Sequence, residues 1–519
     1  MKKNFTLFIL ACSLSVFVTA QISYTNLNQN NCNAALTDIG LLFHDIQNSG
    51  PGYEIPSGSG THAVYAANMW FGGKDINGQL KLAAQTFGPP SQDFWPGALA
   101  TDGTANLPPN LQGQTLWKVS RSQINDHILH YQSPGYSMPA DLENWPAHGD
   151  FSLSQAYDLA PYVDVDGNNI YEPQNGDYPC IKGDEAVYMI INDKGGAHGS
   201  GGDGIGIEQH YMIYQYSSNP DLNDVTFIET KIINRGTATI YDYVSTFFID
   251  GDIGYSQDDY AGSDSTRNLL YFFNSDSNDE SMAISGYGAA PPAVGLVCLS
   301  DSVHSIGIFS NNATYPYSDP VTADDYYNLM HRKYLDGSPW LDGNGLPTKF
   351  QYSGDPNNPG EWTEIGVPNV PGDRRGIISI EKGQLNPFEQ YSITYALVYA
   401  RSSSNLASVT QLYQTVDEVQ NFYDNMADEC YGSNLGINEQ TKGSIIVAPN
   451  PSKGVFTIEL PIDLDAPTVS LIDMHGRTML SEKYPTEDNL KFVTNVSPGV
   501  YIVEIKSGSI IFTERIIIE

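Results

Sequence analysis

The sequence predicts an all-β protein, with a large β-sandwich-like body that carries a few short helices and a small immunoglobulin-like β-sandwich at the C-terminus. Short runs of alternating apolar and polar residues, separated by turn residues, recur along the chain. Segments with the apolar spacing of a helix are few. A chain of 519 residues is long enough for more than one domain and for a sizeable core.

Turn chemistry places most strands of the body, residues 21–432. Asn77-Gly78 lies between two apolar runs and is a strong hairpin signal, because both turn positions require a positive φ. A run of paired strands is expected further on, with Arg235-Gly236 as its first turn. Those strands cover residues 225–234, 240–248 and 269–274, and others cover residues 186–191, 205–216, 375–380 and 391–400.

Three helices are expected within the body. The longest covers residues 406–425, where an apolar residue recurs every three or four positions and predicts a helix that faces the core. A second begins at Ala323, with Thr322 as its cap and Asp325 three positions on, close to a capping box. The third covers residues 122–131.

Residues 1–20 are typical of a signal peptide. Lys2 and Lys3 precede a mostly apolar segment, and Ala20 fits a small-residue cleavage site. A lipoprotein signal ending at Cys12 is the alternative. No later segment has the ~18 uninterrupted apolar residues of a membrane-spanning helix, so we expect no transmembrane segment.

Acidic residues far outnumber basic ones. The chain has 25 basic residues, and loss of Lys2 and Lys3 with the signal peptide leaves 23 against 60 acidic residues, a formal net charge of −37. Such a chain repels phosphates, which argues against a nucleic-acid partner. It suits a protein that binds cations, and equally one kept soluble by a solvated acidic surface.

Four cysteines follow the signal peptide: Cys32, Cys180, Cys298 and Cys430. In an exported chain they allow disulfides in three pairings, and buried free thiols are the alternative. Their wide spacing excludes CxxC metal or redox motifs.

The C-terminal stretch, residues 444–519, carries short alternating strands separated by turn residues. It resembles the type A C-terminal sorting domain of the type IX secretion system. The matching residues are Pro449-Asn450-Pro451, Gly454, Asp473, Gly476-Arg477 and Gly499-Val500-Tyr501. The resemblance implies secretion or attachment to the outer-membrane surface by way of the periplasm, with the type IX secretion machinery as a partner. Residues 433–443 are polar and would form the linker.

A second resemblance covers most of residues 35–430. The order of blocks such as NMWFGGKDINGQLKLAAQTF, YVDVDGNNIYEPQNGDYP, FFIDGDIGYSQDDYAGSD and GDRRGIISI is similar to a family of large secreted proteins of unestablished activity. It implies that these residues form one body, and it implies no catalytic residue.

One loop rich in oxygen ligands contains Asp164, Asp166 and Asn168 around Gly167, followed by Asp177. Carboxylates at alternate positions, amide oxygens and a glycine for the tight turn suit a hard cation such as Ca²⁺. The spacing is not that of an EF-hand. An ordinary turn rich in Asp and Asn is the alternative.

A second acidic loop follows the apolar strand that ends near residue 249. It holds Asp250, Asp252, Asp258, Asp259 and Asp264. So many like charges in a compact loop would raise each other's pKa, and a bound cation is the simplest relief. Exposure to solvent is the alternative. We therefore expect Ca²⁺ as the cofactor of both loops.

Two catalytic interpretations have less support. Asp250 and Asp252, with Asp258 or Asp259, could instead be the acid and nucleophile of a glycosidase, which needs two carboxyl groups either ~5.5 Å or roughly 6.5–9.5 Å apart across a sugar. His198, Glu208 and His210 flank a glycine-rich loop and could bind zinc, but they lack HExxH spacing.

These observations predict a secreted or cell-surface structural or binding protein stabilised by calcium. The alternative is a carbohydrate-active enzyme or glycan-binding module that uses acidic and aromatic residues. The tryptophans, such as Trp70, Trp145 and Trp340, would stack on sugars in that case and otherwise fill the core. A surface glycan or another cell-surface protein is a possible partner.

Overall fold

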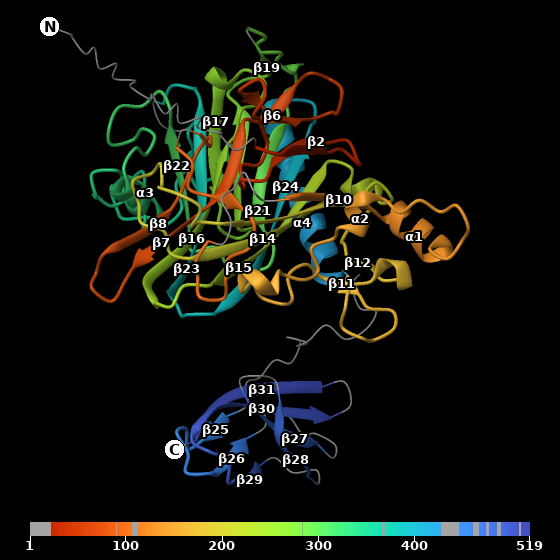
Figure 1. The fold of residues 1–519 in the computed structure, drawn as a ribbon. Coiled ribbons are helices and arrows are strands. Elements are labelled where there is room, and N and C mark those ends of the chain that lie inside the picture. The colour runs from red at the N-terminus through yellow and green to blue at the C-terminus, as the bar shows by residue number, and fades with distance from the viewer. Residues whose placement is uncertain are drawn as a thin grey trace, which may run out of the picture. The chain divides into compact units, whose positions relative to one another are not determined.

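The computed structural model describes residues 22–426, except 90, 106–112, 283 and 366–368, and residues 446–518, except 460–466, 474–476, 485–488 and 508–509. The expected signal peptide and linker lie outside the described residues. The chain divides into two compact units, Met1–Ser433 and Asn434–Glu519. Both are built mainly of antiparallel strands, which confirms the all-β class (Figure 1).

A nine-stranded sheet forms one layer of the body. Eight strands follow each other in space, and β9 (Trp95–Pro96) also pairs with β13. In spatial order the eight are β10 (Leu116–Ser120), β13 (Glu185–Asn192), β14 (Ile207–Gln215), β15 (Val225–Asn234), β24 (Gln390–Ala400), β21 (Ala293–Cys298), β18 (Leu269–Asn274) and β17 (Asp259–Asp264).

A five-stranded sheet forms the second layer, and smaller sheets surround it. Its order is β22 (Ser305–Ser310), β23 (Arg374–Leu385), β16 (Ile240–Asp250), β7 (Ala66–Lys74) and β8 (Leu80–Ala83). A four-stranded sheet contains β1 (Tyr24–Leu27), β2 (Asn33–Thr37), β5 (Tyr53–Glu54) and β6 (His62–Val64). Three two-stranded sheets pair β3 (His44–Asp45) with β4 (Gly50–Pro51), β11 (Tyr162–Val163) with β12 (Tyr178–Pro179), and β19 (Asn278–Asp279) with β20 (Gly288–Ala289).

The main core lies between the two large sheets. Successive side chains of a strand point to opposite faces, so Tyr395 and Leu397 of β24 enter this core while Ala396 points away from it. From the other sheet Phe247 meets Tyr395 with ring centroids 4.8 Å apart. This interdigitation confirms the predicted β-sandwich.

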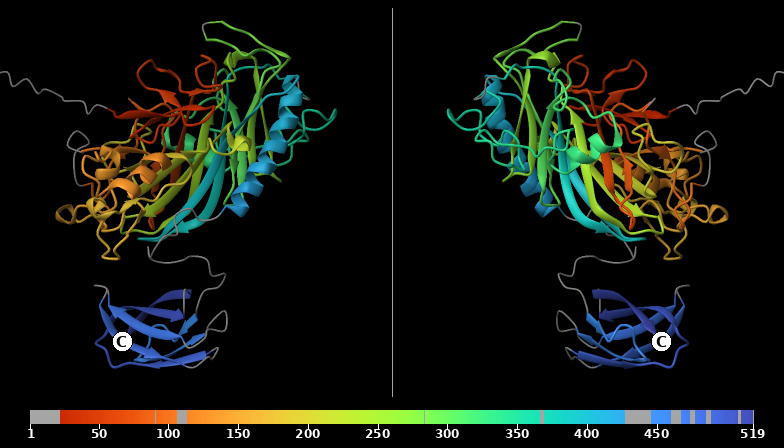
Figure 2. Two further views of the ribbon diagram at one scale, coloured as in Figure 1. Left: turned by 90° about the vertical axis from the view of Figure 1, so that its right-hand side faces the viewer. Right: turned by 90° about the vertical axis from the view of Figure 1, so that its left-hand side faces the viewer.

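Helices cover the outer faces of the sandwich (Figure 2). α4 (Asn405–Asn425) packs on the nine-stranded sheet through the predicted apolar stripe, of which Val409, Leu412, Val416 and Val419 are buried. α3 (Ala323–Met330) covers the five-stranded sheet and begins with the expected capping box between Thr322 and Asp325. Under it lie Trp70 and Trp340, both buried, so these tryptophans belong to the core.

The shorter helices lie in the connections. α1 (Arg121–His130) begins one residue before the predicted start, because Ser120 and Gln123 form its capping box. The others are α2 (Ala140–Glu143) and the 3₁₀ turns η2 (Phe151–Leu153), η3 (Pro173–Asn175), η4 (Pro220–Leu222) and η5 (Ser256–Asp258).

The predicted strand positions agree with the structure more closely than the predicted strand pairing does. β7 and β8 form the expected hairpin, with Gly78 at a φ of +77°. β15 and β16 were expected to pair across Arg235-Gly236, but this prediction is wrong. β15 pairs with β14 and β24, whereas β16 pairs with β7 and β23 in the other sheet. Both strands are buried on both faces, so no exposed polar side indicated the sheet to which each belongs.

The cysteines divide into two groups. Cys180 is disulfide-bonded, whereas Cys32 and Cys298 are buried free thiols. Burial raises the pKa of each of these two thiols to about 12. Cys430 lies outside the described residues.

The C-terminal unit is a small sandwich of two sheets. One contains β25 (Ile446–Ala448), β26 (Val455–Glu459) and β29 (Asn489–Val493). The other contains β28 (Thr478–Lys483), β27 (Thr468–Asp473), β30 (Gly499–Ser507) and β31 (Ile510–Ile518). Asn450 ties the first turn to β31, since its Nδ2 donates to the Arg515 carbonyl (2.7 Å) and its Oδ1 accepts from the Ile517 N–H (2.9 Å).

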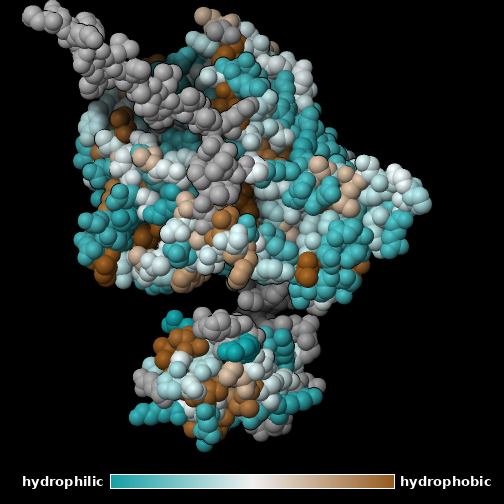
Figure 3. All heavy atoms as spheres, in the orientation of Figure 1, coloured by the Kyte–Doolittle hydropathy of each residue, from teal (hydrophilic) through white to brown (hydrophobic). Residues whose placement is uncertain are grey.

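The visible surface of the body is mostly hydrophilic, with hydrophobic residues in small patches (Figure 3). No helix within the described residues is long and apolar enough to cross a membrane.

Leu412→Ala tests the packing of α4. The side chain is fully buried against the nine-stranded sheet, so its truncation should lower the free energy of unfolding by about 2–5 kcal/mol. Thr410→Ala, on the exposed side of the same helix, should change it by less than about 0.5 kcal/mol. Denaturant unfolding of the full chain measures both, and equal effects would contradict this packing.

Candidate metal centre

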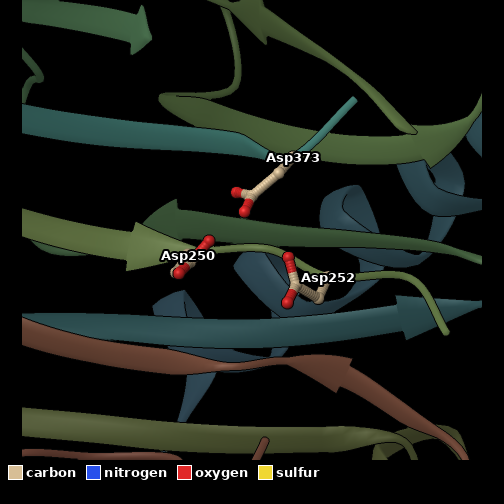
Figure 4. A group of neighbouring side chains, drawn as sticks. All are labelled: Asp250, Asp252 and Asp373. Atoms are coloured by element: carbon tan, nitrogen blue, oxygen red, sulfur yellow. The ribbon is translucent and has the colours of Figure 1, made fainter. Parts of the chain in front are cut away.

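Three carboxyl groups meet where β16 ends and β23 begins. The two strands are antiparallel neighbours, and Asp250, the last residue of β16, lies opposite Arg375. Asp252 follows in the next loop, and Asp373 directly precedes β23. Figure 4 shows their carboxyl groups turned toward a common space. The strand pairing therefore brings together aspartates from distant parts of the sequence.

The spacing of these oxygens fits one ion. Asp250, Asp252 and Asp373 each offer an oxygen, and the three oxygens lie within 4.8 Å of one another. Ca²⁺–oxygen distances are about 2.3–2.6 Å, so two ligands of one ion are at most about 5.2 Å apart. The three side chains are only 2%, 7% and 7% exposed, and the Oδ1 atom of each is buried without a hydrogen-bond partner.

Arg375 is the cation that the structure places against this group. Its Nε lies 3.2 Å from Asp250 Oδ2 and 3.5 Å from Asp373 Oδ1, without forming a hydrogen bond to either. Its Nη1 pairs with Asp319, so one guanidinium is shared among three carboxylates. The arrangement has more negative charge than Arg375 can neutralise.

The pKa values reflect this excess. Burial, and then the charge of Asp373, raise the pKa of Asp252 to about 8. Burial, and then the charge of Asp252, raise the pKa of Asp250 well above its usual range. Ionised carboxylates at these positions therefore need a cation, and without one they favour their protonated forms.

Asp258 and Asp259 extend the acidic region. Burial and the nearby Glu280 raise the pKa of Asp258 to about 7, and neither of its carboxylate oxygens has a hydrogen-bond partner. Asp259 Oδ2 accepts from the Ile253 N–H at 2.9 Å, while its Oδ1 is unpaired. Burial, and then the charges of Asp258 and Asp252, raise the pKa of Asp259 well above its usual range.

Asp264 does not join this group. It is the last residue of β17, and its carboxylate accepts from Arg267 Nη1 (2.7 Å) and from the Thr266 hydroxyl (2.6 Å). Asp264 differs from the other four aspartates of its loop because Arg267, three positions on, neutralises its negative charge.

The loop of Asp164, Asp166, Asn168 and Asp177 is organised by main-chain hydrogen bonds. Asp164 accepts from the N–H groups of residues 167, 168 and 169 at 2.6–3.3 Å, and Asp177 accepts from those of residues 165 and 172 at 2.8 Å. Asp166 accepts from the main-chain and side-chain nitrogens of Asn168. Within the described residues these groups do not converge as Asp250, Asp252 and Asp373 do. Such contacts are typical of the alternative, a turn rich in Asp and Asn, and the calcium site in this loop stays a prediction.

The histidines of the glycine-rich region belong to buried hydrogen-bond networks. His210 Nε2 lies 2.8 Å from Glu208 Oε1, which also accepts from Arg235. His198 is separate from them, with Nδ1 2.8 Å from the Leu82 carbonyl oxygen and Nε2 2.7 Å from the Asp193 carbonyl oxygen. Two acceptors facing both ring nitrogens indicate that His198 is an imidazolium that donates twice.

Sequence reasoning missed Asp373 and Arg375. Asp373 lies within the block GDRRGIISI, and an acidic residue directly before a predicted strand was the available signal. That signal becomes informative only when β23 is known to pair with β16.

Comparisons with known proteins identify the C-terminal unit. Residues 446–519 match the family model of the secretion system C-terminal sorting domain. This part of the chain is thus a type IX secretion sorting domain, and the protein is secreted or carried at the cell surface. No curated protein matches the sequence.

Among solved structures, one that is similar is a polysaccharide lyase, with 11% sequence identity and a TM-score of 0.19. The match covers 60% of this chain and 34% of the lyase, so the chain spans about a third of that protein's length.

His198→Gln tests the buried imidazolium. Burial alone would lower the pKa of His198, but the hydrogen bond and the charge of Asp93 outweigh it and raise the pKa from 6.5 to about 9. A group with a raised folded-state pKa stabilises fully below pH ~6.5, and this contribution is lost as the pH rises through 9.

Wild-type stability should therefore fall between pH ~6.5 and 9 by on the order of 3 kcal/mol from this residue. In His198→Gln this part of the decline should be absent, and in the exposed control His130→Gln it should persist. Unfolding free energies across this pH range provide the measurement. Parallel profiles for wild type and His198→Gln would exclude the imidazolium.

Proposed function

We propose that this secreted or cell-surface protein has a binding or structural role and that Ca²⁺ stabilises its body. The observation that carries the proposal is the convergence of Asp250, Asp252 and Asp373 with buried, unpaired oxygens. Waters and main-chain carbonyl oxygens would complete the six to eight oxygen ligands that Ca²⁺ takes.

The surroundings of the protein favour calcium over other cations. Oxygen-only ligand sets suit hard cations, and this group offers no thiolate or imidazole. Extracellular modules bind Ca²⁺ with dissociation constants of about 10⁻⁴–10⁻³ M. A site that is filled only after export would add stability where the protein works, because binding to the folded state alone favours folding.

The same aspartates give less support to a glycosidase. Its two carboxyl groups would flank a sugar, either ~5.5 Å or roughly 6.5–9.5 Å apart. Asp250 and Asp252 are almost closed to solvent, and with Asp373 they place three oxygens within 4.8 Å of one another, which suits one ion better than two groups on either side of a sugar.

Calcium should raise the unfolding temperature relative to excess chelator. At a free concentration of about 100 times the dissociation constant, the gain is about 2.7 kcal/mol. Asp252→Asn should abolish this response and also make the ion-free protein more stable than ion-free wild type, since it removes a carboxyl group whose burial or protonation costs free energy in the folded state. Calorimetry in calcium and in chelator measures both effects.

Asp126→Asn is the matched control, because Asp126 is exposed on α1 and is not one of the three converging aspartates. It should retain the full calcium response. An unchanged response in Asp252→Asn, or no response in wild type, would refute the calcium site.

Deletion of residues 444–519 should leave the protein in the periplasm. The sorting domain is the part that the type IX machinery is expected to read, and the body does not depend on it for its own core. Cell fractionation with immunodetection compares the truncation with the full chain. Normal surface delivery of the truncated protein would contradict this route.

A further inference from the structure

A second polar site lies beside β22, the edge strand of the five-stranded sheet. It is a cleft of about 690 Å³, within the range of about 300–1,000 Å³ that is typical of small-molecule sites. Its walls come from the loop after β22, the segment after α3, and the segment that leads into β23. None of the three aspartates of the metal centre lines it.

Tyrosines supply part of the apolar surface of the cleft, together with residues such as Phe309 and Pro316. Tyr317 is 52% exposed, and its ring packs edge to face with that of Tyr334, with ring centroids 4.7 Å apart. Tyr352 lines the same cleft at a φ of +49°, a left-handed conformation that is uncommon for a bulky residue. A ring that is both exposed and fixed by a neighbour presents a ready surface for stacking.

Amide side chains and one ion pair supply the polar groups. Asn312 donates to Gln257 Oε1 at 2.6 Å and is exposed at the rim. Deeper in the cleft, Arg374 Nε lies 3.0 Å from both oxygens of Glu364, and Asn369 donates to the same carboxylate at 2.7 Å. Several hydrogen-bonding groups thus surround an aromatic wall.

The charge of the cleft indicates a neutral ligand. Among the described residues that line it, Arg374 and Glu364 are the charged ones, and they neutralise each other. The chain as a whole has a formal charge of −35, which repels anions. A ligand with apolar faces and many hydroxyl groups, and without charge, matches these walls.

We propose that this cleft binds a neutral oligosaccharide. The flat C–H faces of sugar rings stack on tyrosine, and their hydroxyl groups exchange hydrogen bonds with amides and with a fixed ion pair. This assigns a ligand class to a site distinct from the calcium centre, and it holds whether or not calcium binds there.

The cleft is built for binding without hydrolysis. Glycosidases use two carboxyl groups, one of them free to exchange a proton. Glu364 is the carboxyl group that lines the described part of the cleft, and it already accepts from Arg374, Asn369 and the Ala261 N–H. A carboxylate held by three donors is a structural anchor.

The test is an array of immobilised neutral hexose and N-acetylhexosamine oligosaccharides, with uronate-containing and sulfated oligosaccharides on the same surface. The full chain should bind at least one neutral oligosaccharide and none of the charged ones. Tyr317→Ala should weaken that binding about tenfold, equivalent to about 1.4 kcal/mol. Asn312→Ala should weaken it in the same direction, and the bound oligosaccharide should be recovered uncleaved.

Tyr157→Ala is the matched control, because Tyr157 is also 52% exposed and lies outside the cleft. It should bind as wild type does, and all variants should share the wild-type unfolding temperature within a few degrees. Absence of binding to every neutral oligosaccharide, preference for charged ones, or equal losses in Tyr157→Ala and Tyr317→Ala would overturn the proposal.

Discussion

The antiparallel pairing of β16 with β23 is the interaction on which both candidate sites depend. It fixes Asp250 opposite Arg375 at the point where one strand ends and the other begins, and it brings Asp373 to the same place. Neighbouring residues of a strand point to opposite faces, so Arg374 lines the cleft while Arg375 turns toward the aspartates. A single strand end therefore supplies a polar group to each of two separate sites.

The two sites differ in how they balance buried charge. In the cleft, Glu364 meets one guanidinium and the pair is neutral. In the candidate metal centre, Arg375 faces Asp250, Asp319 and Asp373, so carboxylates are in excess. Buried charge of one sign is unfavourable unless a proton or a cation compensates it. The β-ladder can hold this arrangement because its hydrogen bonds fix the backbone of both strands regardless of the charge state of their side chains.

Sequence reasoning was accurate where the signal is local. Apolar periodicity located α4 and most strands, and the clustering of Asp250, Asp252, Asp258 and Asp259 marked the acidic region. The sequence-based predictions failed for features that depend on which strands pair over long distances in the sequence. β15 and β16 are consecutive and buried on both faces, so nothing local shows that the chain changes sheets between them. Asp373 and the tyrosine cleft depend on the same long-range arrangement, and the cleft is assembled from a turn-rich region without periodicity.

The burial of Cys32 and Cys298 has a consequence for the protein in an oxidising compartment. Disulfide exchange proceeds through the thiolate, and Cys32 and Cys298, with their pKa near 12, supply almost none once they are enclosed by the sheets. Cys180, in contrast, forms a disulfide bond. In an oxidising compartment, closure of the sandwich thus shields these two thiols from disulfide exchange. Folding alone therefore keeps two of the chain's cysteines as free thiols, without any separate reductant.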